Sequence, residues 1–194
     1  MSASQRNDAQ RTVHLDGRSL TRAQLVAVAQ GAPVELDDGA LRDVARAADF
    51  LAGKVAQGQP IYGVSTGFGS NADKLLGGSD ASLYAKLQRN LIETHAVCVG
   101  ESFAPDVVRA MLCIRINTLL RGHSGIRVQT LQALAAMLNA GVVPVVPQLG
   151  SVGASGDLAP LSHLAIVLIG GGEAFFGGER LPGGEALRRA GLLP

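Results

Sequence analysis

The residues best suited to chemistry lie in a glycine-rich stretch towards the C-terminal end of the 194-residue sequence, from Gly150 to His163. Gly150, Gly153 and Gly156 recur at every third position and frame an Ala-Ser-Gly tripeptide, which is followed at once by a predicted helix start. Glycine allows the backbone to turn tightly, and the first N–H groups of a helix favour nearby negative charge. The stretch therefore predicts a compact loop that favours developing negative charge.

The glycine spacing argues against the common nucleotide-binding loops. It reads G-x-x-G-x-x-G, whereas the dinucleotide fingerprint is G-x-G-x-x-G after a strand, and the sequence has no G-K-[ST] phosphate-binding segment. Asp157 can cap the following helix, and Pro160 is tolerated in a first turn, where its missing N–H is not needed. A purely structural turn is the simplest alternative for this stretch.

The stretch from Gly150 to His163 resembles the signature of the aromatic amino acid ammonia-lyases and aminomutases. In that family the tripeptide cyclises with loss of two waters to 4-methylidene-imidazol-5-one (MIO), an electrophilic prosthetic group. The resemblance implies that the Gly156 nitrogen attacks the Ala154 carbonyl and that Ser155 loses its hydroxyl to become the methylidene. It implies neither a metal nor a nucleotide cofactor. We also assign Leu158, just after the tripeptide, to substrate binding.

A second glycine-rich loop, from Ile61 to Gly69, carries a tyrosine. Its three glycines disfavour regular structure, and a surface anchor is the simple interpretation of the tyrosine. The loop resembles the family motif Tyr-Gly-x-x-Thr-Gly-Phe-Gly, which implies that Tyr62 is the base that takes the substrate β-proton and that Gly69 binds substrate. A tyrosine hydroxyl is a poor base at neutral pH, so a helix N-terminus or oriented N–H groups must stabilise the phenolate.

A pair of residues at a predicted helix end bears on the choice of substrate. Leucines at four-residue spacing predict a helix from Ser79 to Val97, and His95 continues their stripe, which by itself indicates a histidine at the edge of the core. The family has its ring-selecting pair at this helix end, here Thr94-His95. A hydroxyl residue followed by histidine resembles the histidine lyases, although some tyrosine aminomutases are similar. Cys98 differs from the family, where glycine is common.

The elements that must position these groups are predicted to be mainly helical, because alanine and leucine are frequent and β-branched runs are few. Helices are expected from about Thr21, with a Thr21–Gln24 capping box, and over residues 38–55, 79–97, 105–120, 127–140, 158–169 and 184–190. Extended segments are expected at residues 13–15 and 142–147, and a hairpin at 174–181. The resemblance implies the N-terminal, MIO-bearing part of the helical ammonia-lyase fold.

Composition excludes several function classes. The net charge of +1 gives no reason to expect a nucleic acid or membrane partner. Two cysteines do not make a disulfide framework, and no apolar run is long enough to span a bilayer or to form a signal peptide. We expect a cytoplasmic protein with a disordered N-terminus over residues 1–12 and one domain over residues 13–194.

The resemblance covers only the N-terminal part of the family, whose later helices supply further substrate-binding residues and assemble a homotetramer. The chain is therefore expected to be a fragment or one half of a split enzyme that a second chain completes. One hypothesis is an MIO-dependent lyase of amino acid catabolism that eliminates ammonia from an aromatic L-amino acid, with histidine to urocanate favoured. A phenylalanine or tyrosine lyase, or an aminomutase, is the alternative within the family. The other hypothesis is an inactive, truncated assembly subunit.

Overall fold

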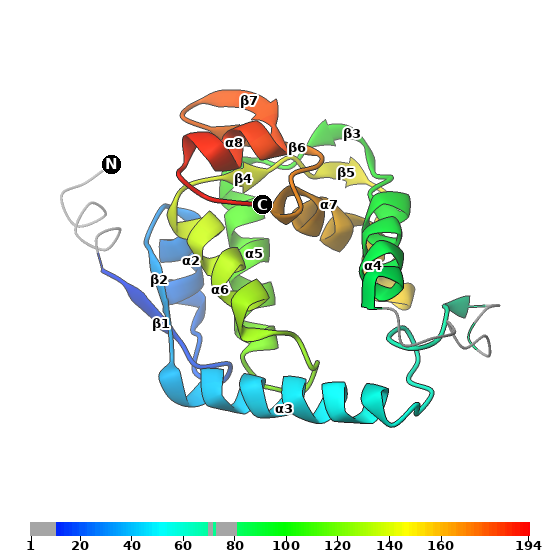
Figure 1. Cartoon of the computed structure of the whole chain (residues 1–194). Coiled ribbons are helices and arrows are strands. Elements are labelled where there is room, and N and C mark those ends of the chain that lie inside the picture. Colours follow the sequence, from blue (N-terminus) through cyan, green and yellow to red (C-terminus); the bar gives the residue numbers. More distant parts are fainter. Residues whose placement is uncertain (1–10, 70–71, 73–80) are drawn as a thin grey trace.

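Helices dominate the structure, a computed structural model that describes residues 11–69, 72 and 81–194 (Figure 1). The helices are α2 (Arg22–Ala29), α3 (Asp38–Ala56), α4 (Ala81–His95), α5 (Pro105–Leu119), α6 (Val128–Asn139), α7 (Leu158–Leu168) and α8 (Gly183–Arg189). The mainly α fold class is confirmed. The expectation of a disordered N-terminus falls on residues that, apart from the last two, lie outside the described part.

The strands are short and form three small sheets. They are β1 (Val13–Leu15), β2 (Val34–Leu36), β3 (Val99–Ser102), β4 (Val143–Pro144), β5 (Pro147–Leu149), β6 (Glu173–Phe176) and β7 (Glu179–Pro182). Strands β1 and β2 pair in parallel, β3 pairs with β5 in antiparallel fashion, and β4, β6 and β7 form an antiparallel sheet. The predicted hairpin is confirmed as β6–β7, whereas the sequence analysis did not predict β2 and β3.

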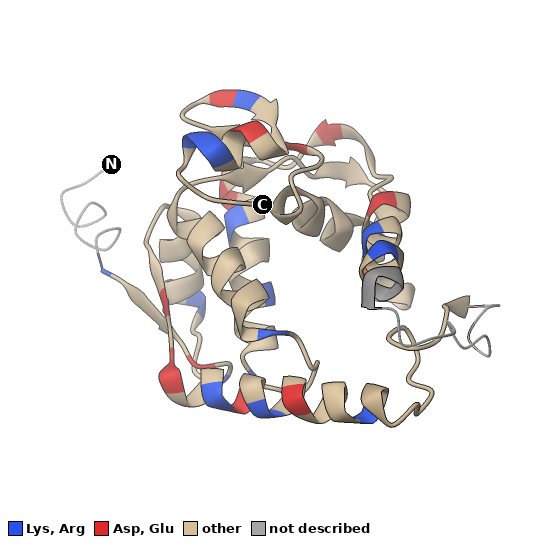
Figure 2. Ribbon diagram, in the orientation of Figure 1, with Lys and Arg blue, Asp and Glu red and all other residues tan. Residues whose placement is uncertain are grey.

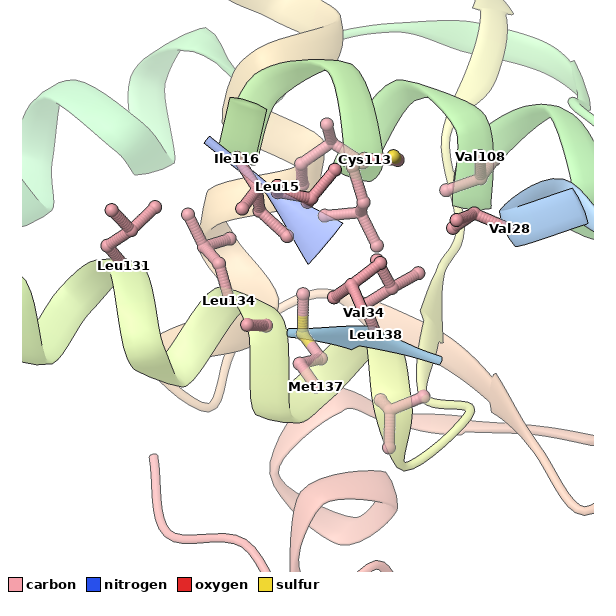
Figure 3. Close-up of a cluster of buried hydrophobic side chains, with 14 of the residues drawn as sticks. Leu15, Val28, Val34, Val108, Cys113, Ile116, Leu131, Leu134, Met137 and Leu138 are labelled. Carbon is pink, nitrogen blue, oxygen red and sulfur yellow. The ribbon is translucent and has the colours of Figure 1, made fainter. Parts of the chain in front are cut away.

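The core lies between α5 and α6, with α2 and the β1–β2 pair closing one side (Figure 3). Side chains of α5 face those of α6 across this core, and both helices owe the contact to apolar residues at three- and four-residue spacing. The labelled members are all buried: Leu15, Val28, Val34, Val108, Cys113, Ile116, Leu131, Leu134, Met137 and Leu138. In Figure 1, α3 runs across the lower ends of α5 and α6, while α4 lies apart from them.

Two asparagine side chains join the N-terminal segment to the later helices. Asn139 accepts a hydrogen bond from the Val34 N–H at 2.8 Å and donates one to the Val34 carbonyl at 2.9 Å. Its amide therefore pairs with β2 as a neighbouring strand would. Asn117 accepts a hydrogen bond from the Gly17 N–H at 3.0 Å. The β1–α2–β2 segment is thus held by residues about a hundred positions further along the chain.

Two predicted helix starts are confirmed by their caps. The Thr21 hydroxyl accepts from the Gln24 N–H at 3.3 Å, and the Gln24 side chain accepts from the Thr21 N–H at 2.8 Å, which is a capping box. Asp37 caps α3 by accepting from the Ala40 N–H at 2.8 Å. Local side-chain chemistry therefore sets both helix starts.

Charged residues are distributed unevenly over the helices (Figure 2). Helix α3 carries acidic and basic residues along its length, as expected of a helix with one face in water. Helix α7 carries no Asp, Glu, Lys or Arg, and its buried residues include Leu164 and Val167. Among the helices in the described ranges, none is long and apolar enough to cross a membrane.

One half-buried arginine on α5 joins the ends of two other helices. Its guanidinium donates to the Val28 carbonyl at 2.9 Å, the Leu138 carbonyl at 2.9 Å and the Ala32 carbonyl at 3.3 Å. These carbonyls lie at or just after the ends of α2 and α6, where intrahelical partners run out. Burial lowers the pKa of Arg109, the guanidinium in question.

We expect Arg109→Met to lower the free energy of unfolding by about 2 kcal/mol, because it leaves carbonyls at the two helix ends without their charged donor. Chemical denaturation monitored by circular dichroism measures the change. Arg115→Met, which removes an exposed arginine from the same helix, is the matched control and should change stability by less than about 0.5 kcal/mol. Equal effects of the two substitutions would contradict the assignment.

Candidate active site

The tripeptide forms a tight, exposed turn rather than an extended loop. Gly153, Ala154 and Ser155 form the 3-10 turn η2 (Gly153–Ser155). The Ser155 N–H donates to the Val152 carbonyl at 2.9 Å, and the Gly156 N–H donates to the Gly153 carbonyl at 3.1 Å. The Ser155 hydroxyl also donates to the Val152 carbonyl, at 2.9 Å. Two residues of the predicted ring, Ala154 and Ser155, therefore lie in this tight turn, and the third, Gly156, follows it directly.

The two residues after η2 have left-handed backbone conformations. Gly156 has φ of 92°, which glycine adopts without strain. Asp157 has φ of 57°, a value that is uncommon for residues other than glycine. The prediction that the Asp157 side chain caps α7 is wrong. Asp157 occupies the N-cap position without a capping hydrogen bond, and its carboxylate instead accepts from the Ser151 hydroxyl. The carboxylate therefore closes the loop across its base.

The loop of residues 150–157, here called the tripeptide loop, is anchored against the segment that follows α4. Strand β5, which enters the loop, pairs with β3 through Val99 and Leu149. Gly150 lies so close to Cys98 that a Cβ atom on it would come within 2.7 Å of the Cys98 sulfur. Close approach of two backbones thus explains the first glycine of the motif.

Apolar side chains surround the tripeptide loop without being buried. Val152 is 60% exposed, and Leu158, the first residue of α7, is 45% exposed. Three more exposed apolar residues lie on the adjoining strands and on the segment before β3: Val97, Val99 and Leu149. The structure therefore places Leu158 beside the tripeptide, on an accessible apolar surface.

Tyr62 lies in a turn whose backbone supports the phenol oxygen. The Gly69 N–H donates to the Tyr62 hydroxyl at 3.3 Å, and the Tyr62 ring meets Phe68 edge to face with centroids 6.0 Å apart. Gly63 has φ of 72°, and a Cβ there would lie 2.7 Å from the Phe68 ring. The side chain of Tyr62 is 65% exposed. The Gly69 N–H is thus the backbone group that contacts the phenol oxygen.

Tyr62 also lines a cavity of about 730 Å³ between α3 and the turn before α6. The walls include Phe50 and Leu51 of α3 and residues 121–125. No residue of the tripeptide loop lines this cavity. Within the described ranges, α4 contacts both the Tyr62 turn and α7. Gln88 of α4 donates a hydrogen bond to the Gly63 carbonyl at 3.3 Å, and α4 packs along α7.

Thr94 and His95 end α4, as predicted, and both bond to their own helix. The Thr94 hydroxyl donates to the Asn90 carbonyl at 2.7 Å. The His95 Nδ1 lies 2.8 Å from the Leu91 carbonyl, which can only accept, so Nδ1 carries the proton in this bond. The neutral ring then has an unprotonated Nε2, which can accept a hydrogen bond from a ligand.

One polar contact near the tripeptide was not predicted from the sequence. The Cys98 N–H donates to the His163 Nε2 at 3.1 Å. The partners are 65 positions apart, and a histidine in an apolar helix does not show which backbone group it meets. The one signal in the sequence was that His163 is a polar residue in a mainly apolar helix.

Comparison with known proteins identifies the family. The sequence model for aromatic amino acid lyases matches residues 20–194, so the chain belongs to the aromatic amino acid lyase family. It is 51% identical over 179 residues to a histidine ammonia-lyase of Symbiobacterium thermophilum, a match that covers 92% of this chain and 35% of that protein.

Solved structures agree with this assignment. Histidine ammonia-lyase from Trypanosoma cruzi superposes with a TM-score of 0.85 at 38% identity, covering 95% of this chain and 35% of that one. The ergothioneine-degrading enzyme ergothionase from Treponema denticola gives a TM-score of 0.90 at 34% identity, covering 95% of this chain and 36% of that one. The chain therefore has the fold of the N-terminal part of these proteins and spans about 35% of the length of the histidine ammonia-lyase it matches.

Proposed function

We propose that residues 13–194 form the tripeptide-bearing domain of an ammonia-lyase that eliminates ammonia from an aromatic L-amino acid, with histidine as the favoured substrate. The observation that carries the proposal is the tight turn at Ala154–Ser155–Gly156 in a chain of the aromatic amino acid lyase family. The remaining two thirds of the relatives' length would come from a further segment or a second chain, and a homotetramer is the assembly we propose.

The turn suits cyclisation of its own residues to MIO. Closure forms a bond between the Gly156 nitrogen and the Ala154 carbonyl carbon, and one water leaves. Loss of the Ser155 hydroxyl with its α-hydrogen removes the second water and creates the methylidene. Gly156 fits this role because its φ of 92° is one that a residue with a side chain adopts only with strain. The finished group would supply an electrophile for the substrate amine.

Tyr62 is the proposed base for the substrate β-proton. Its exposed hydroxyl, which accepts a hydrogen bond from the Gly69 N–H, supports this role because a substrate can reach it. In an elimination from histidine, the β-proton leaves to this oxygen and the amine leaves as ammonia, so that urocanate and ammonium are the products.

The choice of substrate rests on the Nε2 of His95, which has no hydrogen-bond partner among the residues that the structure describes. As an acceptor, it favours a ring that carries an N–H or O–H donor, such as imidazole or phenol, over a plain phenyl ring. Leu158 would contact the substrate through its exposed side chain. Tyrosine, as a lyase or aminomutase substrate, is the alternative that satisfies the same acceptor. The likeness to ergothionase adds ergothioneine to the compounds worth testing.

The test of the proposal is a mass spectrum of the peptide spanning Gly150–His163, followed by an absorbance assay. Loss of two waters from the peptide, together with urocanate formation from histidine, is the expected result. The assay is run on the chain alone and with a chain that supplies the C-terminal part of a relative. An intact peptide mass under both conditions would overturn the proposal and favour an inactive assembly subunit.

We expect His95→Leu to lower kcat/KM for histidine by roughly 10- to 100-fold, because a substrate N–H loses its acceptor in a desolvated site. The value for phenylalanine should stay the same or rise, since leucine offers an apolar wall. Steady-state rates with histidine, tyrosine and phenylalanine measure the shift, and Glu93→Gln, an exposed change on the same helix, is the control. An unaltered order of preference would refute the role of His95.

A further inference from the structure

The segment after α4 contacts both ends of the tripeptide loop. At the entry to the loop, Leu149 pairs with Val99, and Gly150 lies against Cys98. Beyond the loop, on α7, His163 accepts the Cys98 N–H at 3.1 Å. A span of two residues, 98–99, therefore fixes the entry and the exit of the loop that carries the tripeptide.

The same segment carries the proposed ring-selecting residues. Only Ala96 and Val97 separate His95 from Cys98. A shift of Cys98 relative to α7 would therefore also move the end of α4, where His95 lies. The hydrogen bond between Cys98 and His163 therefore connects the segment just after His95 to α7, the helix that follows the tripeptide loop.

The imidazole of His163 is held in one tautomer. Its Nε2 accepts the Cys98 N–H, so Nε2 carries no proton. Burial lowers the pKa of His163, and a backbone contribution from Val145 opposes this shift. The ring thus joins α7 to the segment that follows α4.

We propose that His163 is a positioning residue, whose ring bridges α7 and the Cys98 N–H and holds the tripeptide loop in register with the Thr94–His95 end of α4. This inference rests on the proposed function for its catalytic consequence, but the bridge itself does not depend on that function. The Cys98 N–H is the informative reporter, because Cys98 is only 8% exposed and its amide hydrogen bond is made by this ring.

The test compares His163→Leu, which removes the hydrogen bond from the Cys98 N–H, with His163→Gln, whose amide oxygen can still accept it. His14→Leu, a change in an exposed histidine on β1, is the control. Amide hydrogen exchange at Cys98 is expected to become at least about 10-fold faster in His163→Leu and to recover in His163→Gln. Unchanged exchange at Cys98 in a folded His163→Leu protein would overturn the bridge.

The catalytic readout uses the form of the protein that shows turnover, with rates divided by the fraction of tripeptide that has lost two waters. His163→Leu should lower kcat/KM for histidine by about 10- to 100-fold per matured site, as expected of a misplacement of about 1 Å, and His163→Gln should restore most of it. Wild-type values in His163→Leu would overturn the positioning role alone. An inactive, uncyclised wild-type chain would instead refute the proposed function, and the exchange result would stand.

Discussion

Replacing Ser155 with alanine should reduce ammonia elimination by at least ~10³-fold and leave the tripeptide without its second loss of water. Alanine has no hydroxyl to leave, so the methylidene cannot form even if Gly156 attacks the Ala154 carbonyl. The side chain is exposed, and its one hydrogen bond is to the Val152 carbonyl within the same turn. The free energy of unfolding should therefore change by less than about 1 kcal/mol.

Peptide mass and turnover, measured on the same preparation, check this expectation. Ser19→Ala is a matched control, because Ser19 is an exposed serine far from the tripeptide in sequence. It should keep both the loss of two waters and the full rate. If Ser155→Ala were to turn over substrate at the wild-type rate, the electrophile would have to come from elsewhere, and the proposed chemistry would fail.

Tyr62→Phe should lower kcat by about 10²- to 10⁴-fold while leaving cyclisation complete, because it removes the proton acceptor and not the electrophile. Phenylalanine keeps the edge-to-face contact with Phe68 and loses only the hydrogen bond from the Gly69 N–H. The turn should therefore stay folded, and the substitution isolates the effect of the hydroxyl.

Exchange of the substrate β-hydrogen with deuterated solvent gives an independent measurement of this role. We expect the wild type to catalyse exchange where elimination is reversible, and Tyr62→Phe to do so at least about 100-fold more slowly. Retained exchange in Tyr62→Phe would assign proton removal to another group. Leu51→Ala, a change in the wall of the Tyr62 cavity, tests whether packing alone could produce the same loss.

The sequence predicted the local features of this fold well, because each depends on residues close together in the chain. The Thr21–Gln24 box, the α3 start at Asp37 and the turn at Gly177-Gly178 involve contacts within a few positions. Strands β2 and β3 were missed because three or four residues are too few to show an alternating pattern. Their pairing depends on distant partners.

The candidate site was predictable as a set of motifs but not as an arrangement. Asp157 illustrates the limit: its residue type favours a helix cap, yet its left-handed backbone turns the carboxylate to Ser151. The contact of His163 with Cys98 joins positions 65 residues apart and has no local signal.

The pairing of Asn139 with Val34 also bears on the order in which the molecule assembles during synthesis. The partners are 105 positions apart, so the edge of β2 cannot form its hydrogen bonds to Asn139 until α6 has left the ribosome. Contacts of such long sequence separation slow folding. The tripeptide follows Asn139 in the sequence, so the end of α6 leaves the ribosome before the tripeptide does.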